Sequence, residues 1–200
     1  MRKASGGISE KIVMLGATQT GKTSLVTRFI MEKFISSTEA TIGAAFLTKK
    51  INVDGKDITM DIWDTGGQER YRALAPMYYR DARAAIIVFD LTNSSTILDA
   101  EEWINEIRDH GAKHSLIYVA ANKSDLRNEI SISEKDLNEF KFANQIDHMY
   151  ITSALNGQNV NKMFFDVAKE LIASLPATDD EKGDAKIGVE APKQSSGCCF

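Results

Sequence analysis

One stretch decides the fold of this chain: Gly16-Ala17-Thr18-Gln19-Thr20-Gly21-Lys22-Thr23. It follows Ile12-Val13-Met14-Leu15, an apolar run that predicts a buried strand, and it precedes residues 24–30, which predict a helix. A strand, a loop that ends in Gly-Lys-Thr and a helix together form a phosphate-binding P-loop. The alternative is a chance match, and a chain of this length would contain the pattern by luck roughly once in a hundred cases.

The chemistry of a polyphosphate explains the residue types in this loop. Gly16 and Gly21 let the backbone bend so that successive N–H groups point inward. The helix that follows adds its unsatisfied N–H groups and the positive end of its dipole. The Lys22 ammonium can reach the β- and γ-phosphates, and the Thr23 hydroxyl can ligate magnesium. The predicted nucleotide-binding residues of the loop are Gly16, Ala17, Thr18, Gln19, Thr20, Gly21, Lys22, Thr23 and Ser24.

The composition indicates one globular domain and a tail. The chain has 200 residues, a formal net charge of −4 and no basic run, which argues against nucleic-acid binding. We expect a disordered N-terminal segment at residues 1–8, the domain at residues 9–175 and a flexible tail at residues 176–200. The two cysteines are adjacent in that tail, so the core offers neither a disulfide framework nor a zinc site. No run is apolar enough to span a membrane and no secretory signal is visible, so a cytosolic protein is expected.

Strand and helix patterns alternate along the domain. The predicted strands are residues 12–15, 46–53, 58–63, 84–89, 116–121 and 148–151. Helices are predicted at residues 24–30 and 71–83, and from about residues 94, 133 and 160. Asp54-Gly55 predicts a hairpin, because both residues tolerate positive φ. The pattern is typical of an α/β fold with a mostly parallel six-stranded sheet, one antiparallel hairpin strand and helices on both faces. In such sheets ligands bind at the carboxyl ends of the strands.

The sequence Asn122-Lys123-Ser124-Asp125 follows a predicted strand and can select guanine. The Asp125 carboxylate can accept two N–H bonds from guanine, whereas adenine presents an acceptor at N1 and no 2-amino group. Asn122 can connect neighbouring loops, and the Lys123 stem can lie over the base. A solvated turn would explain these residues alone equally well, but the P-loop upstream favours a nucleotide site. Thr152-Ser153-Ala154 could direct backbone N–H groups at the guanine oxygen.

As an ordered set, these motifs resemble the five nucleotide motifs of Ras-like small GTPases. The matching stretches are residues 16–23, Thr41-Ile42-Gly43, Trp63-Asp64-Thr65-Gly66-Gly67-Gln68-Glu69, residues 122–125 and residues 152–154. Leu74-Ala75-Pro76-Met77-Tyr78-Tyr79-Arg80 and the paired terminal cysteines resemble the Rab family. Residues 41–46 are most similar to the endocytic branch of that family.

This resemblance implies a GTP-binding and GTP-hydrolysing switch that regulates vesicular traffic. It implies that the Gly67 N–H contacts the γ-phosphate and that Gln68 orients the attacking water, with Lys22 as the second catalytic residue. Hydrolysis is then in-line phosphoryl transfer to water, slow without an activating protein. The implied Mg²⁺ ligands are Thr23, Thr41 and, through a water, Asp64. The implied guanine contacts are Phe34, Asn122, Lys123, Asp125, Ser153, Ala154 and Leu155.

The resemblance also implies protein partners and a membrane. The implied effector contacts are Ile42, Phe46, Trp63 and Tyr78, although strand packing alone would explain Phe46 and Trp63 equally well. Exchange factor, activating protein and prenyl-binding chaperone are further implied partners of a protein expected to be a monomer. Cys198 and Cys199 resemble a double-geranylgeranyl signal. The tail has no polybasic patch, so two lipids are needed to hold the protein on endosomal membranes.

Four positions depart from the Rab pattern: Gln19, Thr20, Gly66 and Leu155. A long side chain at residue 19 and a more flexible second loop at Gly66 affect the expected rates, but no phosphate or magnesium ligand is lost. They leave open a poorly hydrolysing, GTP-locked binding module. A P-loop kinase of small molecules is the other alternative, and it leaves residues 122–125 and Gln68 unexplained.

Overall fold

The computed structural model describes residues 7–36 and 39–175. Six strands form one sheet in the order β2-β3-β1-β4-β5-β6. They are β1 (Ile8–Leu15), β2 (Ala44–Val53), β3 (Lys56–Thr65), β4 (Ala84–Asp90), β5 (Leu116–Asn122) and β6 (His148–Ile151). All neighbouring strands are parallel except β2 and β3. The predicted fold class is therefore confirmed, whereas the predictions for residues 1–6 and for the tail with Cys198 and Cys199 lie outside the described residues.

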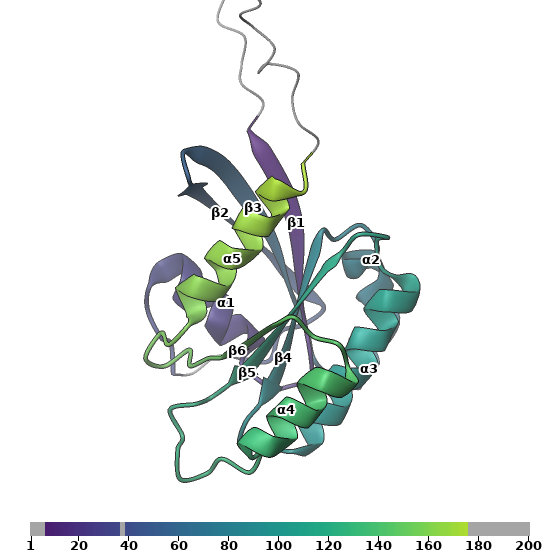
Figure 1. The fold of residues 1–200 in the computed structure, drawn as a ribbon, viewed down its shortest axis with the longest axis vertical. Helices are drawn as coiled ribbons and strands as arrows, with labels where there is room; N and C mark the ends of the chain where they lie inside the picture. The colour runs from purple at the N-terminus through teal and green to yellow at the C-terminus, as the bar shows by residue number, and fades with distance from the viewer. Residues whose placement is uncertain (1–6, 37–38, 176–200) are drawn as a thin grey trace, which may run out of the picture.

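Helices cover both faces of the sheet (Figure 1). The helices are α1 (Lys22–Met31), the 3₁₀ turn η1 (Glu69–Leu74), α2 (Ala75–Tyr79), α3 (Ser95–His110), α4 (Glu134–Ala143) and α5 (Val160–Ala173). One apolar core lies between the sheet and the pair α1 and α5, where the rings of Phe29 and Phe164 stack 4.0 Å apart. The second core joins the other face to α2, α3 and α4. Residues 12–15 of β1 and residues 84–89 of β4 contribute to both cores, which explains why these stretches are continuous apolar runs.

Several predicted details are confirmed. Asp54 and Gly55 adopt φ values of 50° and 84° in the β2–β3 hairpin. Ser133 caps α4 in a capping box with Asp136, so the helix begins where the sequence predicts. Helix α5 buries the six apolar residues of its predicted stripe, namely Val160, Met163, Phe164, Val167, Ala168 and Leu171. A stripe at helical spacing is thus sufficient to orient this helix on the sheet.

Other details differ from the sequence prediction. Strand β1 begins at Ile8, which pairs with Ile58 of β3, so Ile8 does not lie in the N-terminal segment. The helix predicted at residues 71–83 is divided into η1 and α2, because Pro76 has no N–H to continue the first turn into the second. For α3 the sequence of residues 92–94 offers several possible N-caps, and Ser94 occupies that position without a side-chain bond. Asn93 accepts the N–H of Ser95 instead, at 3.2 Å.

Among residues 7–36 and 39–175, no helix combines the length and the apolar character needed to cross a membrane.

Candidate nucleotide-binding site

A cavity of about 600 Å³ lies at the carboxyl ends of the parallel strands. This volume is within the range of pockets for small ligands. The predicted site residues that line it are Thr18, Gln19, Gly21, Lys22, Thr23, Ser24, Phe34, Thr41, Gly67, Gln68, Asn122, Lys123, Asp125, Ala154 and Leu155. Gly16, Ala17, Thr20, Asp64 and Ser153 are outside this lining. Glu39, Ala40, Thr65 and Leu126 line the cavity without having been predicted.

The backbone of the P-loop requires both of its glycines. Gly16 and Gly21 have φ values of 134° and 94°, which glycine adopts at least cost. A Cβ on Gly16 would lie 2.1 Å from the carbonyl oxygen of Val88, and one on Gly21 would lie 2.4 Å from Nδ2 of Asn122. Gln19 also adopts a left-handed conformation, with φ 63°. This conformation is unfavourable for any residue with a Cβ, so Gln19 adds backbone strain to the loop.

Lys22 is a buried ammonium at the floor of the cavity. It is 5% exposed, and its Nζ donates to the carbonyl oxygens of Gly16 at 2.8 Å and Ala17 at 2.7 Å. Burial lowers the pKa of Lys22 to about 8, and the negative charge of Asp64 opposes this shift. An ammonium has three N–H donors, so one more can be given to an anion in the cavity. A phosphate oxygen would compensate the charge that burial disfavours.

Three side-chain oxygens converge beside Lys22. Thr23 Oγ1 donates to Asp64 Oδ2 at 2.6 Å and lies 2.9 Å from Thr41 Oγ1. Asp64 is 1% exposed, and its Oδ1 has no hydrogen-bond partner among the described residues. Burial raises the pKa of Asp64, while the bond from Thr23 lowers it. The carboxylate is therefore placed to share its charge with a cation.

These oxygens fit magnesium. Neighbouring ligands of octahedral Mg²⁺, each at about 2.1 Å, lie about 3 Å apart, which matches the separation of the Thr23 and Thr41 hydroxyls. Within the part of the chain that the structure describes, no group of three or more His, Cys, Asp or Glu could hold a metal. Magnesium needs no such group, because it is commonly bound by one or two carboxylates together with phosphate oxygens.

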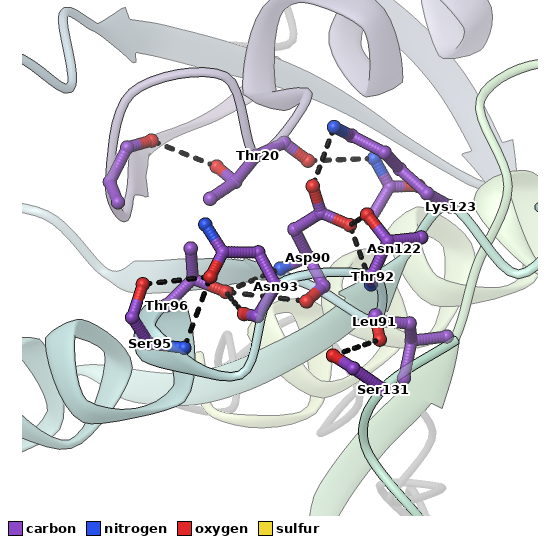
Figure 2. A network of polar contacts seen from close by, with 11 residues as sticks. Thr20, Asp90, Leu91, Thr92, Asn93, Ser95, Thr96, Asn122, Lys123 and Ser131 are labelled. Atoms are coloured by element: carbon purple, nitrogen blue, oxygen red, sulfur yellow. Dashed lines mark hydrogen bonds and ion pairs between the residues drawn. The ribbon is translucent and has the colours of Figure 1, made fainter. Parts of the chain in front are cut away.

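The opposite end of the cavity is built from the loops after β5 and β6. Asn122 is buried, and its Nδ2 donates to the carbonyl oxygen of Thr20 at 2.9 Å (Figure 2). Its Oδ1 accepts the Thr152 hydroxyl at 3.2 Å. The Ser153 hydroxyl donates to Asp125 Oδ1 at 2.5 Å. The P-loop and the loops after β5 and β6 are thus joined, and the Asp125 carboxylate is held in one orientation.

Arg28 is a site residue that the sequence did not reveal. From α1 it donates to the carbonyl oxygens of Ala154 at 2.8 Å, Leu155 at 2.5 Å and Glu32 at 2.7 Å. Ala154 and Leu155 line one wall of the cavity, and Glu32 ends the helix just before Phe34 on another wall. A charged residue in a helix has no local signal that distinguishes such a clamp from a solvated position.

The loop after β3 packs on the P-loop and on the loop before β2. A Cβ on Gly67 would lie 2.5 Å from the backbone nitrogen of Thr18, so only glycine fits there. The Gly66 N–H donates to the carbonyl oxygen of Gly43 at 2.7 Å and extends the β2–β3 ladder by one bond. Gln68 lies beside these glycines at the cavity wall.

Three of the four predicted effector-contact residues, Phe46, Trp63 and Tyr78, form one aromatic cluster outside the cavity lining. The ring centroids of Phe46 and Trp63 are 5.1 Å apart, and those of Trp63 and Tyr78 are 5.4 Å apart. Phe46 is 54% exposed and Ile42 is 80% exposed, far more than strand packing alone would leave. Large exposed apolar residues that cluster mark an interaction site.

Comparison with known proteins agrees with this geometry. Residues 11–173 match the Ras family. The chain is 40% identical to the Ras-related protein RABF2a of Arabidopsis thaliana and 36% identical to the Ras-related protein Rab5 of Nicotiana tabacum, covering 96% of each chain in both cases. It is 38% identical to the Ras-related protein Rab5A of Oryza sativa subsp. japonica, over 94% of each chain. This chain therefore belongs to the Ras family and, within it, to the endocytic branch of the Rab GTPases.

Proposed function

We propose that this GTPase is a membrane-traffic switch that binds Mg²⁺ and GTP in the 600 Å³ cavity and recruits effector proteins in the GTP state. One observation carries the proposal. Lys22 and Thr23 line the same cavity as Asp125 and Ala154, so a phosphate end and a guanine end are joined in one site. The volume and chemistry of that site suit a guanine nucleotide as a whole.

The residues of the chain divide the chemistry between them. Lys22 and the N–H groups of the P-loop bind the phosphates and stabilise the charge that develops in phosphoryl transfer. Gln68 orients the attacking water. Thr23, Thr41 and Asp64 would hold Mg²⁺, which neutralises charge on the β- and γ-phosphates when it is bound. No covalent step involves the protein, so positioning accounts for its contribution.

The switch follows from the loops that meet the γ-phosphate. Thr41 and Gly67 line the cavity from separate loops. The loop with Thr41 leads into the strand that holds Phe46, and the loop with Gly67 follows the strand that holds Trp63. Loss of the γ-phosphate removes a shared ligand from the two loops, which then loosen. An effector that packs on Ile42, Phe46, Trp63 and Tyr78 would bind the ordered state alone.

Hydrolysis tests this proposal directly. In single-turnover assays, the wild-type protein should convert bound GTP to GDP, and Gln68→Leu should lower that rate about tenfold because the water is no longer oriented. The affinity for GTP should stay within about twofold. A rate that Gln68→Leu leaves unchanged would support the GTP-locked module instead, and ATP bound as tightly as GTP would support the kinase.

The Arg28 clamp predicts a second effect. Arg28→Lys keeps the charge but loses the planar fork that reaches Ala154, Leu155 and Glu32. Each charged hydrogen bond contributes about 1.5–3 kcal/mol, so losing part of the clamp should speed the release of fluorescent GDP about tenfold. Arg83→Lys is the control, because Arg83 contacts Glu10 and Ser174 away from the site. Equal rates of GDP release from Arg28→Lys and the wild type would show that the backbone keeps Ala154 and Leu155 in place without the Arg28 side chain.

Membrane attachment rests on the sequence. We propose that geranylgeranyl groups on Cys198 and Cys199 anchor a monomeric protein to endosomal membranes, with a prenyl-binding chaperone, an exchange factor and an activating protein as partners. Replacing both cysteines by serine should move the protein from the membrane fraction to the soluble fraction, because one lipid or none gives only weak binding. Fractionation of cells that express each variant measures this. Continued membrane residence of the double variant would exclude lipid anchoring at these positions.

A further inference from the structure

Asp90 is a buried carboxylate that belongs to none of the nucleotide motifs. It is the last residue of β4 and is 6% exposed. Its Oδ2 forms an ion pair with Lys123 Nζ at 2.6 Å (Figure 2). Its Oδ1 accepts the N–H of Thr92 at 2.9 Å and the Thr92 hydroxyl at 2.7 Å. Both oxygens of the carboxylate are therefore satisfied, one by a turn and one by a residue of the base-selecting loop.

This contact holds the ammonium end of the Lys123 side chain. Its backbone has φ 67° between Asn122 and Asp125, and its side chain lines the cavity. Because the ammonium is held by Asp90, fewer rotamers are open to the aliphatic stem of Lys123 at this end of the cavity. A free lysine has many rotamers, and ordering it when the nucleotide binds would lower affinity. Here the Lys123 side chain is already ordered by Asp90 before the nucleotide binds.

Asp90 is itself held in place by its surroundings. Its backbone N–H donates to the Thr96 hydroxyl at 2.9 Å in the first turn of α3. The next N–H, that of Leu91, donates to the carbonyl oxygen of Asn122 at 3.0 Å, so β4 and the base-selecting loop are joined twice. The Lys123 ammonium thus meets a carboxylate whose own backbone cannot shift freely.

We propose that Asp90 is a positioning residue for guanine nucleotides and that it acts through Lys123. The inference rests on the proposed function, since it assumes that the Lys123 stem lies against the base. The competing explanation is that Asp90 serves only the turn it closes with Thr92, in which case Lys123 is an incidental partner. The two explanations differ in whether the effect of Asp90 requires Lys123.

A double-mutant cycle on the release of fluorescent GDP from the full-length protein separates them. Asp90→Asn keeps the size of the side chain and an oxygen for Thr92, and it removes the charge that holds Lys123. We expect about tenfold faster release from Asp90→Asn and from Lys123→Met. In the Lys123→Met background, adding Asp90→Asn should change the rate by less than about twofold. Asp90→Glu, which keeps the charge, should release GDP more slowly than Asp90→Asn.

Glu10→Gln is the matched control. Glu10 is a mostly buried carboxylate paired with Arg83 at 3.4 Å in a part of the sheet away from the cavity. It should release GDP within about twofold of the wild-type rate. Should Asp90→Asn fail to fold, adding Asp90→Asn to Lys123→Met still separates the explanations, because the charge-neutral double variant should release GDP as Lys123→Met does if Asp90 acts through Lys123, and faster if Asp90 serves only the turn.

Each result decides between the explanations. Equal acceleration by Asp90→Asn in the wild-type and Lys123→Met backgrounds would overturn the proposal, as would a wild-type rate in Asp90→Asn. A wild-type protein that retains no guanine nucleotide would instead refute the proposed function, and this inference with it. If the wild type retains guanine nucleotide but the cycle shows no coupling between Asp90 and Lys123, only the role of Asp90 would be refuted and the proposed function would stand.

Discussion

Asp125→Asn is expected to lower the affinity for GDP by about a thousandfold or more and to raise the affinity for xanthosine diphosphate. A carboxylate accepts both N–H groups of guanine, whereas an amide presents one acceptor and one donor. Sites built around such hydrogen bonds reject a mismatched ligand by about 10⁴–10⁵. The Ser153 hydroxyl donates to Asp125 Oδ1, so it should keep the amide oxygen of the variant on its own side and turn the amide N–H₂ toward the base. Xanthine has a carbonyl at C2, which can accept that donor.

Equilibrium titration with fluorescent GDP and its xanthine counterpart measures both affinities. Asp147→Asn is the control, because Asp147 is an exposed residue before β6 that lies outside the cavity. It should bind both nucleotides as the wild type does. Unchanged binding of GDP by Asp125→Asn would mean that Asp125 does not meet the base, and the guanine assignment would be lost.

Lys22→Met should lower nucleotide affinity by about 10–10²-fold. The variant keeps most of the stem volume and removes the ammonium, so the loss reports charge rather than packing. A charged hydrogen bond contributes about 1.5–3 kcal/mol, so losing the one N–H that Lys22 has left for a phosphate oxygen gives about this range. The carbonyls of Gly16 and Ala17 also lose their donor, which loosens the P-loop further.

The measurement is the amount of guanine nucleotide that co-purifies with the protein, followed by titration. Lys169→Met is the control, since Lys169 is exposed and pairs only loosely with Asp54 at 3.7 Å. It should retain nucleotide as the wild type does. If the Lys22→Met protein still co-purifies with stoichiometric nucleotide, the phosphates do not bind at Lys22.

The sequence is sufficient for those parts of the fold that depend on local pattern. Strands β4 and β5 are continuous apolar runs, and α5 has an uninterrupted helical stripe, so their place and burial could be predicted. The P-loop could be predicted because its glycines, lysine and threonine each have a fixed role at a fixed spacing. The split of the helix at Pro76 was missed because its context suggested one loose helix.

Partners that are distant in the chain could not be predicted. Arg28 meets Ala154, and Asp90 meets Lys123, although nothing near Arg28 or Asp90 in the sequence points to these contacts. Such pairs depend on how helices and strands pack together. A single sequence does not show which residues far apart in the chain lie close together in space. The same is true of Glu39 and Ala40, which line the cavity from a loop without periodicity.

The backbone bond between Gly66 and Gly43 has a consequence for signalling. It joins the loop before β2 to the loop after β3, so opening one loop alone would break a bond that contributes about 0.5–1.5 kcal/mol. An intermediate with one loop open is therefore disfavoured, and the two loops are expected to open and close together, as in a two-state transition. A partner that contacts only one of the two loops should therefore also respond to a change in the conformation of the other.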